Sequence, residues 1–503
     1  MAQLPEDALR YSYPLYGGTA RNLAIGGAGA SLGGDITSAH INPAGIGLYK
    51  NREVVITPGF SFRNNKFDYR GSEEKGNDNS FNYGTSGVVF GKVNRYNTAN
   101  SSAFSISINQ LANYNNHISY GGFNNNSSWS EQYVEQLAGD KASINDAENN
   151  YIFGSSLAYW TFLVDTVSDA QGNVTGYQSL VPLPANPQGG SGGVMQSNTI
   201  DTKGGAHELA FAYGNSYADK LHLGISINIP FYTFTKDQIY REDDATDNPD
   251  NSFKFFEYKE HYKTTGVGFN AKLGVIYRPI ERLRLGLAFH TPTFGGFTDK
   301  IDASITTNTE KYTVYPQPIT KTSNELKDNT ATGNYDYNLV TPLRVIASGS
   351  WVVNSVSDVK KQKGFVTADV EFVNYGGTRY SAADETNSDD VNYYDQLNGI
   401  IKNRYKGAVN VRVGGEMKFK TLMGRLGFAY MSSPYKDKQL NGRRILLSGG
   451  AGYRNKGFFV DLTYQHALIR DSQVPYYLED KANYIADGKA NRGNVILTFG
   501  IKI

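Results

Sequence analysis

Apolar and polar residues alternate along most of the chain from about residue 52 onward. In LHLGISINIPFY, every second residue from Leu221 to Phe231 is apolar, and the residues between them are mostly small or polar. The same alternation occurs in four further segments: 282–290, 409–419, 458–465 and 494–503. Because successive side chains of a β-strand point to opposite sides of the sheet, each segment predicts a strand with one apolar and one small or polar face.

The whole pattern predicts fourteen strands, near residues 52–64, 81–93, 101–119, 205–216, 220–236, 257–279, 282–295, 341–354, 363–376, 406–419, 422–433, 442–455, 457–470 and 490–503. The connections after the even-numbered strands are short, and those after the odd-numbered strands are mostly long. This arrangement is typical of an up-and-down outer-membrane barrel, which also has an even number of strands. We therefore predict an all-β protein, a 14-stranded antiparallel transmembrane β-barrel, whose closure leaves no unpaired sheet edge.

Hydropathy agrees with this fold class. No stretch approaches the 18 or more consecutive apolar residues of a membrane helix, whereas a barrel strand needs only about 9 to 11 residues to cross the membrane. Many of the 36 tyrosines fall near predicted strand ends, as in an aromatic girdle, although tyrosine is also a common strand residue. Met1 is followed at once by Ala2-Gln3-Leu4-Pro5, so we expect a mature form without a signal peptide.

The composition excludes several classes of function. The chain has no cysteine, which excludes a disulfide framework, a thiol nucleophile and a cysteine-based zinc site. A net charge of +1 gives no electrostatic case for nucleic acid. The seven histidines show no metal-ligand spacing. We therefore expect no cofactor, no metal and no nucleic-acid partner.

Two glycine-rich segments suggest enzymes at first sight. Gly27, Gly29 and Gly33 form GxGxxxG, one residue off the dinucleotide-binding fingerprint, but no strand precedes them. The segment 189–193, GGSGG, satisfies GxSxG but lacks the strand and helix of a nucleophile elbow, and its composition indicates a flexible linker. We expect the protein not to be an enzyme, and an outer-membrane lipase is set aside because no nucleophile and base can be placed together.

The largest loop, about 120–204, is too long to lack structure of its own. Ser128 and Glu131 form a capping box and Gly139 is a stop signal, which predicts a short helix. A second helix is predicted within 145–164, whose end is unusually apolar for a loop. That apolar end either packs on other loops or binds an apolar ligand.

Charged residues also occur on the predicted lumen face of the strands. The basic ones are Lys272, Arg284, His290, Arg344 and Arg412, and the acidic ones include Asp369, Glu371, Glu416 and Asp461. Such charges either pair with one another, or an inward arginine or lysine binds the carboxylate of an amphipathic ligand. The sequence leaves both interpretations open.

Several segments in order resemble a known family. The glycine-rich stretch ending in Asn42-Pro43-Ala44-Gly45 is followed by a first strand, and further matches are GVGFNAKLGVIYRPIERLRLGLAFHTPTF (266–294), DVEFVNYGG (369–377), VRVGGEMKF (411–419) and RLGFAYMSSPY (425–435). Together they span nearly the whole chain. They resemble the FadL-type outer-membrane transporters of long-chain fatty acids and hydrocarbons.

The resemblance implies an N-terminal hatch, residues 1–51, that plugs the lumen of a barrel formed by residues 52–503. In this family, apolar outer loops capture the ligand, and hatch movement and a lateral opening in the wall release it. The implied gate residues are Asn42, Pro43, Ala44 and Gly45. The expected ligand-binding residues are Leu23, Ile25, Ile36, Ile41, Trp160, Phe162, Leu163, Arg284, Arg344 and Arg412.

The sequence therefore predicts passive uptake of hydrophobic or amphipathic small molecules, such as long-chain fatty acids, across the outer membrane of a Gram-negative bacterium. The expected partners are the hydrophobic ligand, outer-membrane lipid and lipopolysaccharide. The alternative is a FadL-like barrel that does not transport and serves as a subunit of an outer-membrane secretion or assembly complex with protein partners. Whether the apolar loop surface around Trp129, Trp160 and Phe162 faces a channel mouth would distinguish the two.

Overall fold

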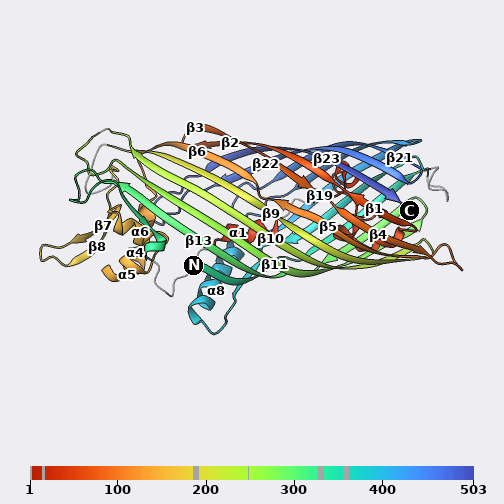
Figure 1. Cartoon of the computed structure of the whole chain (residues 1–503), viewed down its shortest axis with the longest axis horizontal. Coiled ribbons are helices and arrows are strands. Elements are labelled where there is room, and N and C mark those ends of the chain that lie inside the picture. The colour runs from red at the N-terminus through yellow and green to blue at the C-terminus, as the bar shows by residue number, and fades with distance from the viewer. Residues whose placement is uncertain (1–2, 14–16, 185–191, 247, 327–332, 355–361) are drawn as a thin grey trace.

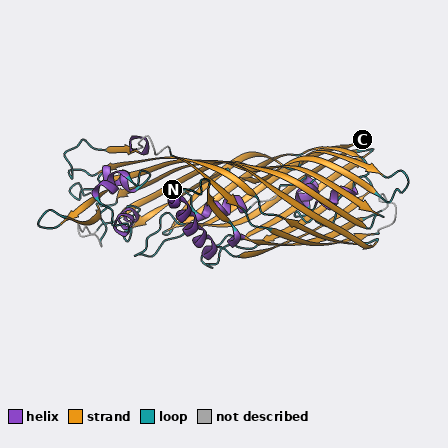
Figure 2. Ribbon diagram, turned by 90° about the horizontal axis from the view of Figure 1, so that it is seen from below, coloured by secondary structure: helices purple, strands orange, loops and turns teal. Residues whose placement is uncertain are grey.

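The computed structural model describes residues 3–13, 17–184, 192–246, 248–326, 333–354 and 362–503. The described chain forms a closed antiparallel barrel with a 14-stranded wall, as predicted. Closure is made by the last strand, which pairs with the first two strand segments of the chain. Figures 1 and 2 show strands running obliquely along an elongated body.

Eight strands of the wall are continuous, and six consist of two pieces that follow each other along the wall. The continuous strands are β9 (Val194–Tyr217), β10 (Leu221–Asp244), β11 (Phe255–Ile280), β19 (Gly407–Phe419), β20 (Leu422–Met431), β21 (Arg444–Asn455), β22 (Phe458–Gln473) and β23 (Ala486–Lys502). The two-piece strands are β1 (Arg52–Ile56) with β2 (Pro58–Tyr69), β3 (Ser72–Tyr83) with β4 (Ser86–Val93), β5 (Ser101–Asn113) with β6 (Asn116–Asn124), β12 (Leu283–His290) with β13 (Phe294–Asn308), β15 (Asn334–Val340) with β16 (Arg344–Val353), and β17 (Gly364–Asn374) with β18 (Arg379–Ala382).

Three of the interruptions coincide with a proline. Pro58 follows β1, Pro292 separates β12 from β13, and Pro342 separates β15 from β16. Proline has no backbone N–H to donate to a sheet ladder, so it favours a break in the strand at these positions.

The two ends of the barrel differ in their connections. At one end, the turn end, strands are joined by short turns, which are two residues long at 281–282, 420–421 and 456–457. At the opposite end, the loop end, the connections are mostly long, and the longest runs from 125 to 193. An exception is the two-residue turn Arg70-Gly71 between β2 and β3, where the sequence predicted a long loop. Apart from the buried Phe67 and Tyr69, residues 65–80 are polar or glycine, and this composition hides the strands from a search for alternation.

The outer surface near the turn end is an apolar belt. On β10 the outward residues from Leu221 to Phe231 are apolar and at least partly exposed, whereas the next outward residues, Thr233 and Thr235, are polar. The same change occurs on β11, where Val267 to Tyr277 supply the apolar part. The belt therefore spans about the 9 to 11 residues that a strand needs to cross a membrane. The strands continue beyond it toward the loop end with polar outer faces.

The described helices lie in the lumen or near the loop end of the barrel (Figures 1 and 2). Within the described residues, no helix has both the length and the hydropathy that a membrane crossing requires. The elements before β1 are α1 (Pro5–Ser12), α2 (Ala20–Ala24), α3 (Ser38–Ile41) and the 3-10 helix η1 (Pro43–Leu48). The loop-end elements are α4 (Glu131–Gly139), α5 (Ile144–Asn149), α6 (Ser155–Trp160), β7 (Val164–Ser168), β8 (Val174–Ser179), β14 (Ile319–Thr322), α7 (Ser323–Leu326), η3 (Tyr375–Gly377) and α8 (Ser388–Arg404).

The N-terminal segment, described over residues 3–13 and 17–51, packs against the inner face of the wall on two sides. Helix α2 contacts β20, β21, β22 and β23, and η1 contacts β5, β9, β10 and β11. Close approach on the second side is permitted by a row of three inward glycines on neighbouring strands, Gly214, Gly224 and Gly274, which lie directly opposite one another. A Cβ atom on Gly224 would lie 2.2 Å from the carbonyl carbon of Pro43, so only glycine fits there. We call these three residues the glycine row.

The predicted loop helices are present. Helix α4 begins at Glu131 and ends at Gly139, with Ser130 and not Ser128 at its N-cap. Of the predicted capping box only one half is formed: the Glu131 carboxylate accepts a hydrogen bond from the Ser128 backbone N–H at 3.1 Å, whereas the Ser128 hydroxyl accepts from the Ser130 N–H. The second predicted helix is divided into α5 and α6. These elements enclose a small core with β7 and the ends of β9–β11, which contains Trp129, Leu137 and Phe253. Most of the GGSGG segment lies outside the described residues.

Candidate functional site: the central cavity

The lumen contains two adjoining cavities. The larger, which we call the inner cavity, lies between the N-terminal segment and the wall. The smaller, the upper cavity, reaches helix α1. Ala112 and His290 line both, so the two cavities are neighbours.

The inner cavity is mainly apolar with a few polar groups. The apolar side chains come from the N-terminal segment and from several strands, and they include Leu23, Ile41, Ile346, Met431, Leu446 and Ile496. The polar groups include Arg412, Arg492 and His290. An apolar cavity with a few placed polar groups is the usual architecture of a ligand site.

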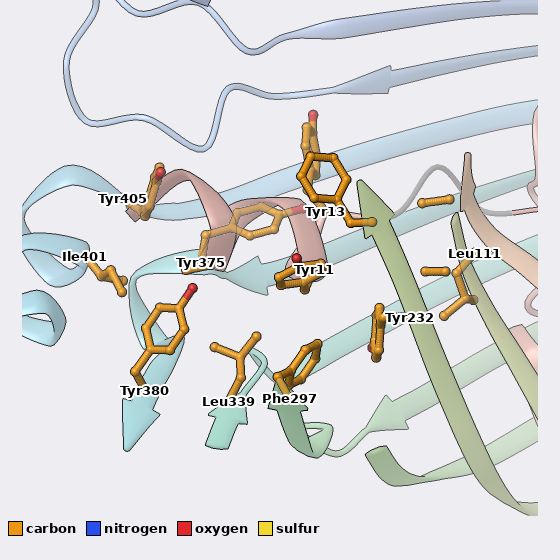
Figure 3. Close-up of a cluster of buried hydrophobic side chains, with 14 of the residues drawn as sticks. Tyr11, Tyr13, Leu111, Tyr232, Phe297, Leu339, Tyr375, Tyr380, Ile401 and Tyr405 are labelled. Carbon is orange, nitrogen blue, oxygen red and sulfur yellow. The ribbon is translucent and has the colours of Figure 1, made fainter. Parts of the chain in front are cut away.

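Helix α1 and a cluster of aromatic side chains separate the upper cavity from the loop end. In this cluster, which we call the tyrosine cover, Tyr11 of α1 lies beside Tyr232 of β10 and Phe297 of β13 (Figure 3). Further members come from β11, β15, β18 and α8, and include Tyr262, Tyr337, Tyr380 and Tyr394. Buried aromatic pairs in edge-to-face or offset contact add to the apolar stabilisation of such a cluster. Tyr11 and Tyr232 of the cover line the upper cavity, so the cover borders it.

The start of the described chain is held inside this cover by Asp299 of β13. The Asp299 carboxylate accepts hydrogen bonds from Gln3 Nε2 at 2.7 Å, Tyr262 Oη at 2.6 Å and Thr264 Oγ1 at 2.7 Å. Asp299 lies beyond the apolar belt, and its burial raises its pKa to about 6 despite these donors. Tyr393 and Tyr405 also donate to backbone carbonyls of the segment, those of Gln3 and Pro5.

Two buried networks join the middle of the N-terminal segment to the wall. His40 Nδ1 lies 2.8 Å from Glu208 Oε1, and Lys272 forms an ion pair with the same carboxylate. On the other side, Arg21 approaches Glu416 at 3.4 Å, and Arg425 binds both Glu416 and Asp461 at 2.7 and 2.6 Å. Arg454 also pairs with Asp461 at 3.6 Å and Lys418 with Glu416 at 4.0 Å, so the second network contains four basic and two acidic side chains.

Of the predicted gate residues, Asn42, Pro43 and Ala44 lie against Gly224 and Gly274 of the glycine row, whereas Gly45 packs against Gly33 and Ser38. The Asn42 amide donates to the carbonyls of Ala30 at 2.6 Å and of Val275 at 3.2 Å, and its Oδ1 accepts from the Ala44 N–H at 3.1 Å. Pro43 begins η1, where its missing N–H costs nothing. Asn42 therefore ties the N-terminal segment both to itself and to β11.

The backbone ladder is interrupted beside the inner cavity. Strands β4 and β5 pair up to Ser86 and Ile108. Beyond that point, the described residues 82–84 and 110–113 are joined by side chains, for example by Gln110 Oε1, which accepts from the Tyr83 N–H at 3.3 Å. Both segments line the inner cavity. We call this place the ladder break.

The three arginines singled out from the sequence all bind structural partners. Arg284 donates to the Leu32 carbonyl at 2.6 Å, and Arg344 to the Ser12 carbonyl. Arg412 forms a 2.6 Å ion pair with Glu371, which also lies 3.4 Å from Arg344. Arg412 lines the inner cavity and Arg344 the upper one. Arg344 and Arg412 therefore reach a cavity, and both already have Glu371 as an acidic partner.

The predicted apolar residues divide into three groups. Leu23 and Ile41 line the inner cavity. Ile25 and Ile36 are buried against the wall instead, with only Ile25 at the edge of a third, smaller cavity. The three loop residues lie at the loop end and line none of the described cavities: Leu163 is part of the loop core, Phe162 stacks on Tyr315, and Trp160 is 41% exposed.

A buried carboxylate organises that loop core. Glu242, at the loop end of β10 and beyond the apolar belt, accepts hydrogen bonds from the Trp129 N–H at 2.9 Å, Tyr240 Oη at 2.8 Å and Gln196 Nε2 at 2.8 Å. Burial raises the pKa of Glu242 to about 7. Its role is to hold the start of α4 against the wall.

Sequence reasoning missed Arg492, Arg63 and Arg444. Arg492 lines the inner cavity, and Arg63 lies opposite it on β2. The alternation of β23 places Arg492 on the same face as Asn494 and Ile496, so extending that pattern by two residues would have found it. Arg444 and Arg63 stand in more polar segments, where alternation gives little signal.

No protein-family model and no curated protein sequence matches the chain. Solved structures do match over nearly the whole length. A FadL homologue of Pseudomonas aeruginosa superposes with a TM-score of 0.54 at 12% identity, covering 97% of this chain and 99% of the other. The toluene transporter TodX of P. putida gives 0.50 at 10% identity (97% and 99%), and the toluene transporter TbuX of Ralstonia pickettii gives 0.50 at 12% identity (97% and 98%).

The chain has the FadL-type fold. At this identity the likeness establishes the architecture and leaves the cargo open. In the FadL-type fold of this chain, the lumen holds an N-terminal segment, two cavities and a tyrosine cover. The described residues contain no cluster of three or more histidines or acids placed to bind a metal.

Proposed function

We propose that the protein is an outer-membrane channel for passive uptake of hydrophobic or amphipathic small molecules, such as long-chain fatty acids, in a Gram-negative bacterium. The observation that carries this proposal is the inner cavity, a mainly apolar space enclosed in the lumen and bordered by the ladder break. The FadL-type fold and the hydrocarbon-transporting proteins that share it support the same function. Lipid and lipopolysaccharide surround the barrel at its apolar belt.

The route follows from the two ends of the barrel. The loop end faces outward, and cargo reaches the upper cavity when the tyrosine cover and α1 move. It then passes to the inner cavity and leaves sideways at the ladder break, between 82–84 and 110–113, when the N-terminal segment acts as a hatch. Asn42, Pro43, Ala44 and Gly45 form the gate in this scheme.

Apolar transfer drives the process. Each methylene moved from water into an apolar cavity gains about 0.8 kcal/mol, so a long acyl chain is captured without energy coupling. Downhill diffusion into the membrane then supplies the direction. The described residues supply no catalytic step to this scheme.

The test is to lock the hatch to the wall with a disulfide. The hydroxyls of Ser31, in the N-terminal segment, and Ser348, on β16, lie 2.7 Å apart. A double Ser31→Cys, Ser348→Cys variant fits the short span of a disulfide, and the native chain has no cysteine to interfere. Oxidation should reduce uptake of radiolabelled oleate into proteoliposomes at least tenfold, and dithiothreitol should restore it.

The matched control is a second cysteine pair that does not involve the N-terminal segment. Thr306 and Thr320 are cross-strand partners on β13 and β14 whose hydroxyls lie 2.9 Å apart. Their disulfide should leave uptake unchanged. Unchanged uptake in the oxidised Ser31–Ser348 pair, with the bond confirmed by mass spectrometry, would contradict a moving hatch.

A second candidate function is a non-transporting subunit of a secretion or assembly complex. It is favoured by an exposed apolar group at the loop end, in which Val314 is 98%, Tyr315 60% and Trp160 41% exposed. Such a surface is typical of a protein contact. A barrel that takes up no oleate but copurifies with a stoichiometric protein partner, lost on Tyr315→Ser, would favour this alternative.

A further inference from the structure

One arginine of the inner cavity has no acidic partner. Arg492 is 8% exposed, and its Nε and Nη2 donate to Ser61 Oγ at 3.2 and 3.0 Å. Within the described chain, no carboxylate lies within 4.0 Å of it, in contrast to Arg412, which is paired with Glu371. An unpaired buried charge is costly, so its presence beside a cavity calls for a reason.

Two further arginines strengthen the local positive charge. Arg63 is the cross-strand partner of Arg492, and the charges of Arg63 and Arg444 both act on Arg492. Neither forms an ion pair among the described residues, and Arg444 stacks on the Tyr13 ring at 3.8 Å instead. We call Arg63, Arg444 and Arg492 the arginine triad.

The acids around the triad do not balance it. Asp78 is the cross-strand partner of Arg63 on β3, and Asp471 of β22 faces Arg63 and Arg444. Neither carboxylate lies within 4.0 Å of a guanidinium nitrogen of the triad. The triad and its two acids together leave one positive charge, which one negative charge on a ligand would neutralise.

Uncharged groups around Arg492 complete a polar corner of the inner cavity. The Asn82 amide donates to Ser61 Oγ at 2.5 Å and to Asn494 Oδ1 at 2.8 Å. Asn82 and Asn494 line the cavity beside Arg492, and Asn82 also belongs to the ladder break. The polar corner is therefore at the side of the cavity where the wall is interrupted.

The rest of the cavity suits a hydrocarbon chain. Leu23, Ile41, Ile346, Met431 and Leu446 supply apolar lining to it. A ligand with one anionic group and an apolar chain would place the two parts against matching surfaces. Charge-assisted hydrogen bonds from a guanidinium are strong and geometrically selective, especially where water is excluded.

We infer that the inner cavity selects amphiphiles with a single negative charge, whose anionic group binds at Arg492 within the arginine triad, next to the ladder break. This inference rests on the proposed uptake function and adds a selectivity to it. Neutral hydrocarbons, named as the cargo of TodX and TbuX, would gain nothing from this corner. The triad is the anion subsite, whereas Arg344 and Arg412 are held by Glu371.

The experiment measures binding to the purified full-length barrel in detergent by displacement of the fluorescent fatty acid cis-parinarate. Two competitors share one chain and differ in the head group: oleate is anionic and oleyl alcohol is neutral. Arg492→Gln should weaken oleate binding about tenfold and leave oleyl alcohol binding within twofold. The control is Lys489→Gln, which removes an exposed positive charge from the same strand and should change neither.

The outcomes separate the inference from the proposed function. If Arg492→Gln binds oleate as the wild type does, or loses oleate and oleyl alcohol equally, the anion subsite is refuted. If acetate at millimolar concentration displaces parinarate, the subsite takes small free anions and the amphiphile assignment is overturned. If wild-type protein binds neither long-chain compound, the uptake function itself fails, and the inference fails with it.

Discussion

A single methyl group added to the glycine row should loosen the N-terminal segment. In Gly224→Ala the new Cβ would lie 2.2 Å from the Pro43 carbonyl carbon and 2.3 Å from the Ala44 nitrogen, both backbone atoms. Ordinary contacts at such a carbon begin near 3.4 Å. Neither atom can rotate away, so η1 must retreat by about 1 Å, as happens when a packed core is overfilled.

The size of the effect follows from that displacement. Overpacking by one methyl group costs about 1–3 kcal/mol. The same displacement strains the bonds from Asn42 to the Ala30 and Val275 carbonyls. Because about 1.4 kcal/mol corresponds to a factor of ten, the population with a displaced segment should rise about 5- to 150-fold.

Two measurements report this change. Hydrogen exchange followed by mass spectrometry should show faster exchange across residues 43–48, and planar-bilayer recordings should show more frequent ion-conducting openings. Gly349→Ala is the matched control, because a Cβ at this strand glycine meets nothing within 4 Å. Exchange and conductance of Gly224→Ala equal to those of Gly349→Ala would refute the argument that the glycine row holds η1 in place.

Two further predictions concern buried carboxylates. Glu208→Gln leaves Lys272 buried without its acid, so the stability of the barrel should fall by about 3–5 kcal/mol. Glu73→Gln, in an exposed pair, should leave the melting midpoint nearly unchanged, and equal midpoints of the two variants in a gel-shift melting assay would contradict this. The pKa of Glu242 is about 7 in the folded protein, compared with an ordinary value of 4.5. Between these two pH values the folded protein keeps a proton on Glu242 that the unfolded chain releases. The stability of the loop core therefore falls as the pH rises from 4.5 to 7. Urea titration of the Trp129 fluorescence should show this slope in the wild type and none in Glu242→Gln.

The wall could be predicted from sequence because its outward residues face an apolar belt. The alternation around Leu221–Phe231 arises directly from that belt, and it gave the strand number and the segregation of connections. Beyond the belt the outer face of a strand is polar, and in residues 65–80 most inward positions are polar as well, so this segment was predicted to be a loop although it forms most of the β2–β3 hairpin. The breaks within six strands were also invisible to alternation alone.

The site was harder to predict because a lumen charge has the same local pattern whether it is paired or free. Arg412 and Arg492 both follow the inward positions of an alternating strand, yet Glu371 neutralises only the first. That difference depends on strands far apart in the chain. The tyrosine cover was missed for a similar reason, since its members come from α1, α8 and five strands.

The interruptions of the two-piece strands have a consequence for how such a barrel changes over time. Thr293 and Thr341, each next to a break, are joined to each other, so neighbouring breaks lie at one height. On the turn-end side of that height β12 pairs with β16, and on the loop-end side β13 pairs with β15. The strand register on the two sides is therefore set by separate ladders. Insertions or shifts in the upper ladders therefore need not propagate into the part that faces lipid. The part of the wall near the loop end can therefore change in sequence and register while the part near the turn end is kept.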